Sequence, residues 1–358
     1  MTTAYINRIA TVVPAYDVHS AFLAFARSQL AGDRRKSLLF GRMAEKGGID
    51  HRFSCLEPSE DAQSGAVDTG GFYSRGEFPT TAARMRLFEE HAPVLAARAV
   101  DRLVPEEQER SSITHLVIAC CTGFSAPGLD LEIVERCGLK GTIERTMVGF
   151  MGCYAAMNAL KLSRHIVRSE PTARVLVVNI ELCTLHLKET DDLLQNLSFM
   201  VFADGCSAAL VTATPEGIAL DSFHAVLSPN TRDLITWNIR ESGFDMVLSG
   251  QVPTAVYEAL SGGADEILAG AAVSEIDLWA VHPGGRSVLD AVERALHLAP
   301  EALGVSREIL RRFGNMSSAT VMFVLQALMD RQPKRQSGCA MAFGPGLVAE
   351  TMLFHTGS

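Results

Sequence analysis

An internal repeat constrains the fold of this chain more than any other feature of its sequence. Three pairs of segments recur at one spacing of 163 residues, although few of the paired residues are identical. The pairs are Ile113–Ile118 with Ile276–Val281, Phe150 with Phe313, and Arg174–Ile180 with Ser337–Phe343. A stretch of small residues with helical spacing follows each phenylalanine. Three pairs in phase indicate that one fold has been built twice.

Short, continuous apolar segments alternate with helical patterns in both halves of the chain. This alternation is typical of a mostly parallel sheet with helices on its faces. Two such halves related by pseudo-symmetry predict an α/β protein with a duplicated, five-layer α/β/α/β/α body. We place the halves at residues 1–214 and 215–358, because the strand-like segment Ala208–Thr214 ends there and no Pro- or Ser-rich linker follows.

The composition argues against several classes of protein. Hydrophobic residues make up 47% of the 358 residues, which is enough to offset the entropy of ordering the chain. The net charge of −9 provides no basic field for nucleic acid. Met1–Ala10 lacks the pattern of a secretory signal, and no apolar run approaches the roughly 20 residues of a membrane-spanning helix. We therefore expect a cytoplasmic protein with no nucleic-acid partner and no membrane span.

The eight cysteines contain no Cys-x-x-Cys pair, so we expect neither a disulfide framework nor a zinc cluster. Most of them should be small buried residues, which leaves room for one nucleophile. Cys153 is the strongest candidate, because it follows Gly149 and Gly152 and opens a helix of small residues. A thiol at the start of a helix lies at the positive end of the helix dipole, which favours the thiolate.

Two polar residues of the second half can join this cysteine. His282 follows the apolar strand Leu278–Val281, and ligands of α/β proteins bind at the carboxyl ends of strands. Asn315 lies, by the spacing of the repeat, in the turn equivalent to Gly152. Pseudo-symmetry then predicts that two helix tips meet, one with a thiol and the other with an amide. Taken alone, a structural histidine and an N-cap asparagine are the commoner roles.

A Cys–His–Asn set supports two chemistries. In papain-like proteases the histidine is the general base for attack of the cysteine on a peptide. Alternatively, the thiolate accepts an acyl group from a thioester, and the other two side chains hold the enolate formed when a malonyl group loses carbon dioxide. The papain pattern Cys-Gly-Ser-Cys-Trp is absent, which favours acyl transfer. A non-catalytic acyl-CoA-binding relative is disfavoured by the complete set.

A basic segment stands out in this acidic chain. Its seven basic residues are Arg34, Arg35, Lys36, Arg42, Lys46, His51 and Arg52. A solvated helix face is the common interpretation of such a segment, and a binding site for a phosphorylated ligand is the more specific one.

Several motifs together resemble the bacterial type III polyketide synthases of the chalcone synthase superfamily, which have the thiolase fold. They are His282-Pro283-Gly284-Gly285, Gly314–Ala319 and Phe343-Gly344-Pro345-Gly346. The resemblance implies a homodimer that uses acyl-CoA and malonyl-CoA and needs no metal and no cofactor besides these substrates. It implies that Cys153 carries the acyl group, while His282 and Asn315 donate to the enolate. Ketoacyl synthases of fatty-acid initiation are the nearest alternative, but they usually have Asn-Thr-Ser and another terminal glycine turn.

The resemblance also implies binding residues. Those for CoA are Arg42, Lys46, Gly284 and Ser287, and a lysine expected three residues before Arg42 is Leu39 here. Those for the substrate cavity are Cys121, Ala126, His186, Phe202, Trp237, Met246, Phe343 and Pro345. Phe202 matches the gatekeeper phenylalanine, and Met246 replaces a second gatekeeper. Ala126 stands where the plant enzymes have a methionine that reaches into the partner's cavity, so we expect less shaping of the pocket across subunits.

Two segments indicate a subfamily. Cys121-Thr122-Gly123 and Glu181–His186 resemble the alkylresorcinol and alkylpyrone synthases, which accept long-chain fatty acyl starters. We therefore expect a long-chain starter and cyclisation to a pyrone or a resorcinol-type phenol. Cys121 together with the bulky Trp237 is also similar to the malonyl-only naphthalene-type synthases, and that alternative stays open.

Overall fold

The computed structural model describes residues 2–63, 65–331 and 335–357. Its main feature is a sheet of nine strands in the order β11-β12-β13-β8-β1-β7-β6-β4-β5. These strands are β1 (Tyr5–Val12), β4 (His115–Cys120), β5 (Glu144–Gly149), β6 (Val175–Leu182), β7 (Asp204–Thr212), β8 (Ile218–Leu227), β11 (Leu278–Val281), β12 (Ser337–Gly344) and β13 (Val348–Thr356). Two small sheets pair β2 (Tyr16–Asp17) with β3 (Phe53–Ser54), and β9 (Ile235–Arg240) with β10 (Gly243–Leu248).

The helices surround and divide this sheet. The α-helices are α1 (His19–Gln29), α2 (Arg34–Gly47), α3 (Thr81–Leu103), α4 (Glu107–Arg110), α5 (Leu129–Arg136), α6 (Ala155–Ser169), α7 (Leu193–Phe199), α8 (Val252–Ile267), α9 (Arg286–Ala295), α10 (Gly304–Phe313) and α11 (Thr320–Asp330). The short 3-10 helices are η1 (Gly152–Tyr154), η2 (Cys183–His186), η3 (Val273–Glu275), η4 (Ser317–Ala319) and η5 (Pro345–Leu347).

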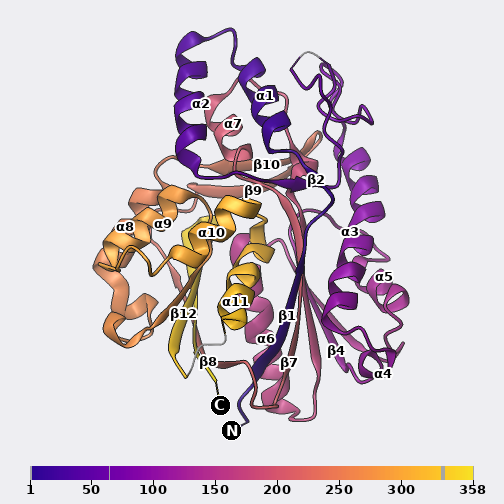
Figure 1. Ribbon diagram of the computed structural model, residues 1–358, viewed down its shortest axis with the longest axis vertical. Coiled ribbons are helices and arrows are strands. Elements are labelled where there is room, and N and C mark those ends of the chain that lie inside the picture. The colour runs from indigo at the N-terminus through magenta and orange to yellow at the C-terminus, as the bar shows by residue number, and fades with distance from the viewer. Residues whose placement is uncertain (1, 64, 332–334, 358) are drawn as a thin grey trace.

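The predicted five layers are present. From one side to the other lie α3 and α5, the strands of the first half, α6 and α11, the strands of the second half, and finally α8 and α9 (Figure 1). The two half-sheets join only through the short pairing of β1 with β8, at Tyr5–Ala219 and Ile6–Ile218. The central helices α6 and α11 are therefore enclosed between two sheets.

Strand side chains show why the strands are apolar throughout. In β4, Leu116 and Ile118 pack in the core under α3, while Val117 and Ala119 pack against the central helices. In β11, Ala280 likewise faces the central helices. A strand buried on both faces needs continuous apolar sequence, which is the pattern that predicted these strands.

The repeat holds in the strands and shifts at the helices. In one half His115 pairs with Val175, and in the other Leu278 pairs with Gly338, so the register repeats at the predicted spacing of 163 residues. The central helices α6 and α11 begin at Ala155 and Thr320, which are 165 residues apart. Two residues have therefore been inserted between Phe313 and α11.

The predicted boundary between the halves, at 214/215, lies in the turn between β7 and β8, and this division of the chain stays a prediction. At one end of the body, α1, α2, α7 and the β9–β10 hairpin form a cap above the carboxyl ends of the strands (Figure 1). Among the described residues, none of the helices is both long and apolar enough to span a membrane.

Candidate active site

Cys153 lies at the tip of one central helix, where β5 turns sharply into η1 and α6. The turn contains Phe150 with φ 59° and Gly152 with φ 79°. A side chain at Gly152 would overlap the ring of Pro345, so this position requires glycine for both its backbone and its surroundings. The turn thereby brings Cys153 against the η5 segment at the end of β12.

The second central helix brings its own tip to the same place, because η4 packs against η1. Ser317 opens η4 with φ 48°, as Gly152 opens η1, and the two residues are 165 apart. Ser317 is therefore the structural counterpart of Gly152. The sequence had assigned this place to Asn315, and that assignment is wrong because of the two inserted residues.

Asn315 presents its amide nitrogen to the site. Its side-chain oxygen Oδ1 accepts a hydrogen bond of 2.9 Å from the Ser317 backbone N–H, which fixes the orientation of the amide. Nδ2 donates to the carbonyl oxygen of Gly284 at 3.2 Å, and the Asn315 side chain also forms a hydrogen bond with the thiol of Cys153. Asn315 thus connects the cysteine with the glycines that follow His282.

His282 is buried directly after β11, where its backbone N–H donates to Met341 at 2.7 Å. Neither ring nitrogen has a hydrogen-bond partner in the part of the chain that the structure describes. Burial lowers the pKa of His282 to about 3, so the imidazole is neutral. A buried imidazole with two unused nitrogen atoms is available to a ligand that supplies polar atoms.

The state of Cys153 differs from the sequence-based expectation. Burial raises the pKa of the Cys153 thiol to about 12, and hydrogen bonds from Ser317 and Asn315 offset only part of this effect. Among the described residues no hydrogen bond joins Cys153 to His282. The free protein therefore holds a neutral thiol and a neutral imidazole at pH 7, and the position at a helix tip does not outweigh desolvation.

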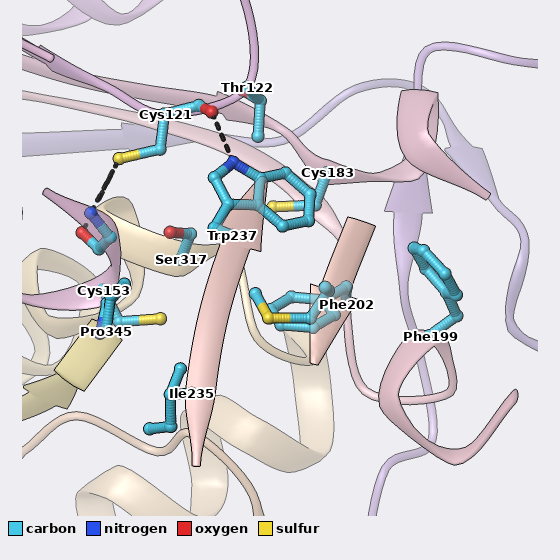
Figure 2. A pocket seen from close by; sticks show the side chains of 12 residues that line it. Cys121, Thr122, Cys153, Cys183, Phe199, Phe202, Ile235, Trp237, Ser317 and Pro345 are labelled. Carbon is cyan, nitrogen blue, oxygen red and sulfur yellow. Dashed lines mark hydrogen bonds between the residues drawn. The ribbon is translucent and has the colours of Figure 1, made fainter. Parts of the chain in front are cut away.

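An enclosed cavity of about 20 Å³, room for about one water molecule, adjoins Cys153. Its predicted lining residues are Cys121, Phe202, Trp237, Met246 and Pro345, and sequence reasoning missed Thr122, Gly152, Cys183, Phe199, Ile235 and Ser317. Figure 2 shows the sulfur of Cys153 pointing into the space beside Ile235 and Trp237. The wall is made of sulfur atoms and aromatic rings, which suits an apolar chain.

Three predicted cavity residues do not line this space. Ala126 is exposed on the surface of the single chain, and Phe343 is buried in the core behind the strand ends. His186 lies one layer behind the wall, stacked on Phe244 at 4.1 Å. Its Nδ1 accepts from the Phe244 N–H at 3.1 Å, so Nε2 donates to the Thr122 carbonyl at 2.7 Å. His186 therefore supports the wall and has no nitrogen free for substrate.

The wall residues Cys121 and Trp237 are fixed by backbone groups. The indole N–H of Trp237 donates to the carbonyl of Cys121 at 2.8 Å, and the Gly152 N–H donates to the sulfur of Cys121 at 2.9 Å (Figure 2). The Gly152 N–H is therefore already used and cannot bind a reacting carbonyl, contrary to what the glycine turn suggested.

A buried carboxylate, Glu181, ties the two tips together. It accepts hydrogen bonds from the Cys121 N–H at 3.0 Å, the Thr122 hydroxyl at 2.9 Å and the Ser318 hydroxyl at 2.5 Å. Burial nevertheless raises the pKa of Glu181 to about 7. Its place at the end of an apolar strand, in Asn179-Ile180-Glu181, was the sequence signal that could have indicated it.

An open groove of about 620 Å³ lies on the other side of Phe199–Phe202, between α2 and α9. Of the predicted CoA-binding residues, Lys46, Gly284 and Ser287 line it. Arg42 does not, although it lies one turn before Lys46 on α2. It lines a neighbouring hollow with Arg34 and Arg35.

The described residues contain one group with the composition of a metal site, formed by His115, Glu144 and Glu170. His115 and Glu144 begin β4 and β5, whereas Cys153 follows the opposite end of β5. Both glutamates are exposed, and exposed carboxylates commonly cluster without an ion. This group is therefore separate from the Cys153 site.

Comparison with known proteins agrees with this geometry. The N-terminal domain of chalcone and stilbene synthases matches residues 9–215, and the C-terminal domain of the same family matches residues 220–357. The alpha-pyrone synthesis polyketide synthase-like Pks18 of Mycobacterium tuberculosis is 34% identical over 99% of this chain and 91% of its own length. The bisdemethoxycurcumin synthase of Oryza sativa is 32% identical over 89% of this chain and 83% of its own length.

Solved structures show the same fold. The polyketide synthase PKS-I of the brown alga Ectocarpus siliculosus superposes with a TM-score of 0.87 over 99% of both chains, at 29% identity. The type III polyketide synthase domain of Steely1 from Dictyostelium, at 23% identity, shares the fold with a TM-score of 0.87 over 99% of both chains. With the family matched over nearly its whole length, this chain belongs to the chalcone and stilbene synthases and is a type III polyketide synthase.

Proposed function

We propose that Cys153 carries the growing acyl chain and that His282 and Asn315 stabilise the enolate formed from malonyl-CoA. The observation that carries the proposal is the meeting of the two helix tips. A thiol, an oriented amide N–H and a buried imidazole with unused nitrogens surround one enclosed space. This is the donor arrangement that acyl transfer with an oxyanion intermediate needs.

Loading begins from the neutral pair. As the sulfur of Cys153 attacks the carbonyl carbon of acyl-CoA, its proton passes to His282, and the same proton then leaves with the CoA thiolate. The products are the Cys153 thioester and free CoA. Because the pKa of Cys153 is about 12 and that of His282 about 3, this transfer must accompany the attack and cannot precede it as a stable ion pair.

Extension follows in the same space. Malonyl-CoA loses carbon dioxide, and the enolate oxygen accepts hydrogen bonds from His282 and from Nδ2 of Asn315. Each such donor typically lowers the barrier by about 3 kcal/mol. The enolate carbon then attacks the Cys153 thioester, which lengthens the chain by two carbons, and the released thiolate regains a proton. The proposed chemistry needs CoA thioesters as substrates and no further cofactor.

The proposed CoA site is the open groove. Lys46, Gly284 and Ser287 line it, and Arg42 extends the positive charge of α2 beyond it. The groove and the enclosed cavity share the segment 198–202 as a wall, so a thioester arm in the groove would point its sulfur end toward Cys153.

For the product we propose a pyrone, because a curated relative at 34% identity is named for alpha-pyrone synthesis. The long-chain starter remains a proposal with a structural condition. The cavity of about 20 Å³ holds no acyl chain of any length, so Phe202, Met246 or another wall residue must move when the starter binds.

We further propose a homodimer in the cytoplasm. β5 is the edge strand of the main sheet, and its exposed Met147 lies near the exposed Phe124 and Ala126, which suits burial against a second subunit. All eight cysteines are free thiols, as a reducing compartment requires. Light scattering of the purified protein tests the dimer.

The roles of His282 and Asn315 can be tested apart from condensation. Malonyl-CoA decarboxylation to acetyl-CoA should fall by about two orders of magnitude in His282→Ala and in Asn315→Leu. A Cys183→Ala variant at the cavity wall serves as the control and should decarboxylate normally. Unchanged decarboxylation in the His282 and Asn315 variants would show that other groups hold the enolate.

A further inference from the structure

The wall between the open groove and the enclosed cavity is a single stretch of chain, residues 198–202, which we call the wall segment. Phe199 and Phe202 face the cavity of Cys153, whereas Ser198, Met200 and Val201 face the groove. The position of this backbone therefore sets how much space an acyl chain has beside the sulfur.

One side of the wall segment is bound to the catalytic turn. The Asn315 N–H donates to the carbonyl of Val201 at 2.8 Å, and the Ala203 N–H donates to the carbonyl of Asn315 at 2.9 Å. Phe202 and Asn315 thus form a parallel bridge. A shift of the wall would be transmitted directly to the amide that faces Cys153.

The other side of the wall segment is held by the guanidinium of Arg52. One nitrogen, Nη1, donates to the carbonyls of both Phe199, at 2.9 Å, and Phe202, at 3.1 Å. These are the two residues whose rings line the cavity. The same side chain also packs against the catalytic turn, because a Cβ at Gly314 would lie 2.8 Å from Cγ of Arg52.

Arg52 is itself firmly placed. It is fully buried, its Nε donates to Nδ1 of His19 at 2.9 Å, and its guanidinium lies over the ring of Phe22 at 5.5 Å. Burial lowers the pKa of Arg52 only to about 10, so the group stays charged at neutral pH. Arg52 belonged to the basic segment of the sequence, yet it is separate from the exposed helix α2 and has no access to a phosphorylated ligand.

We propose that Arg52 is a positioning residue that determines starter selectivity: it fixes the wall segment and thereby sets the length of acyl chain that fits beside Cys153. The proposal rests on the proposed role of Cys153 as acyl carrier. A planar guanidinium can bind the two carbonyls and His19 at once, whereas the single ammonium of lysine cannot reproduce that fork. Removing the fork frees Phe199 and Phe202 to move outward.

The test compares acyl loading of wild type, Arg52→Lys and Arg52→Met. Each protein is mixed with butyryl-CoA or decanoyl-CoA, and the rate of acyl adduct formation on Cys153 is followed by mass spectrometry. We expect the decanoyl-to-butyryl ratio to rise about tenfold in Arg52→Met, a discrimination typical of apolar pockets, and to rise less in Arg52→Lys. Malonyl-CoA decarboxylation should change less than the ratio does.

Arg84 offers a matched control. It is also fully buried, donates to the backbone carbonyls of Leu185 at 2.7 Å and Leu187 at 2.9 Å, and lies over an aromatic ring, that of Tyr73. None of these residues lines the cavity. Arg84→Lys should therefore lower thermal stability about as much as Arg52→Lys and leave the ratio unchanged.

Two results would overturn the proposal: an unchanged ratio in folded Arg52 variants that still load, or an equal change of the ratio in Arg84→Lys. Failure of the proposed function gives a different result, because wild-type protein would then form no adduct on Cys153 with either starter. Since Arg52→Lys keeps the charge and most of the volume, it provides a folded variant if Arg52→Met is too unstable.

Discussion

The two helix tips at the centre of the molecule share a backbone and differ in chemistry. Both begin with a residue of positive φ, Gly152 at 79° and Ser317 at 48°, and both continue through a 3-10 turn into a central helix. At the next position one tip has the thiol of Cys153 and the other the hydroxyl of Ser318, which donates to Glu181. Duplication supplied the geometry twice, and one side chain decides which copy is the nucleophile.

The largest effect is expected from exchanging chemistry at the two equivalent positions. Cys153→Ala should lower polyketide formation by at least about a thousandfold, because no other group can carry the acyl chain. Ser318→Ala should keep most activity and lose about 1–3 kcal/mol of stability, since Glu181 loses one of its donors. Product formation and urea unfolding measure the two effects. Equal activity loss in both variants would contradict the distinction between the tips.

The first positions of the tips should also differ. Gly152→Ala forces a side chain to a residue of positive φ and into Pro345, and we expect about 3 kcal/mol of destabilisation. Ser317→Ala, at the equivalent place, has no such conflict and should lose less than about 1 kcal/mol. Thermal unfolding of the two variants checks this order, and a Gly152→Ala protein as stable as wild type would refute the close packing of η1 on η5.

The carboxylate between the tips makes stability depend on pH. The folded pKa of Glu181, about 7, is above its ordinary value of 4.5, so its contribution is fully present below pH 4.5 and is lost as pH rises through 7. Glu181→Gln should match wild type near pH 4.5 and exceed it by roughly 1–3 kcal/mol at pH 8. The difference between the two proteins isolates Glu181 from Asp204 and the buried histidines. A difference that is constant with pH would contradict the raised pKa.

The smallest effect is expected at the hydroxyl of Ser317. Its hydrogen bond lowers the pKa of Cys153, so its removal should raise that pKa further and reduce the thiolate present at any given pH. Alkylation of Cys153 by iodoacetamide at pH 9 should slow by about three- to tenfold in Ser317→Ala. Cys183 in the same protein serves as the internal reference. Faster alkylation of Cys153 would show that Ser317 does not stabilise the thiolate.

The sequence predicted what is local or periodic. The register of the repeat, the ends of α3 and α6, and the approach of Cys153 to Asn315 follow from apolar patterning and from glycine turns. It did not predict the roles of Ser317, Glu181 and Arg52. These depend on which distant residues a side chain meets once it is buried, and a two-residue insertion that pattern matching did not register moved Ser317 into the place given to Asn315.

Burial also explains the misassigned residues. His186 and Arg52 are polar residues in positions where sequence reasoning expects contact with a ligand, but both spend their hydrogen bonds on backbone groups of the cavity wall. The thiolate of Cys153 was predicted from the helix dipole alone. In the folded protein the desolvation of the sulfur is the larger effect.

The central claim is that the sulfur of Cys153 is the acyl carrier. Its most direct test is to incubate the protein with an acyl-CoA in the absence of malonyl-CoA and to locate the adduct by peptide mass spectrometry. The account predicts one acyl group for each chain, on the peptide that contains Cys153. An adduct on Cys121 or Cys183, or no adduct while polyketide is still formed after malonyl-CoA is added, would contradict it.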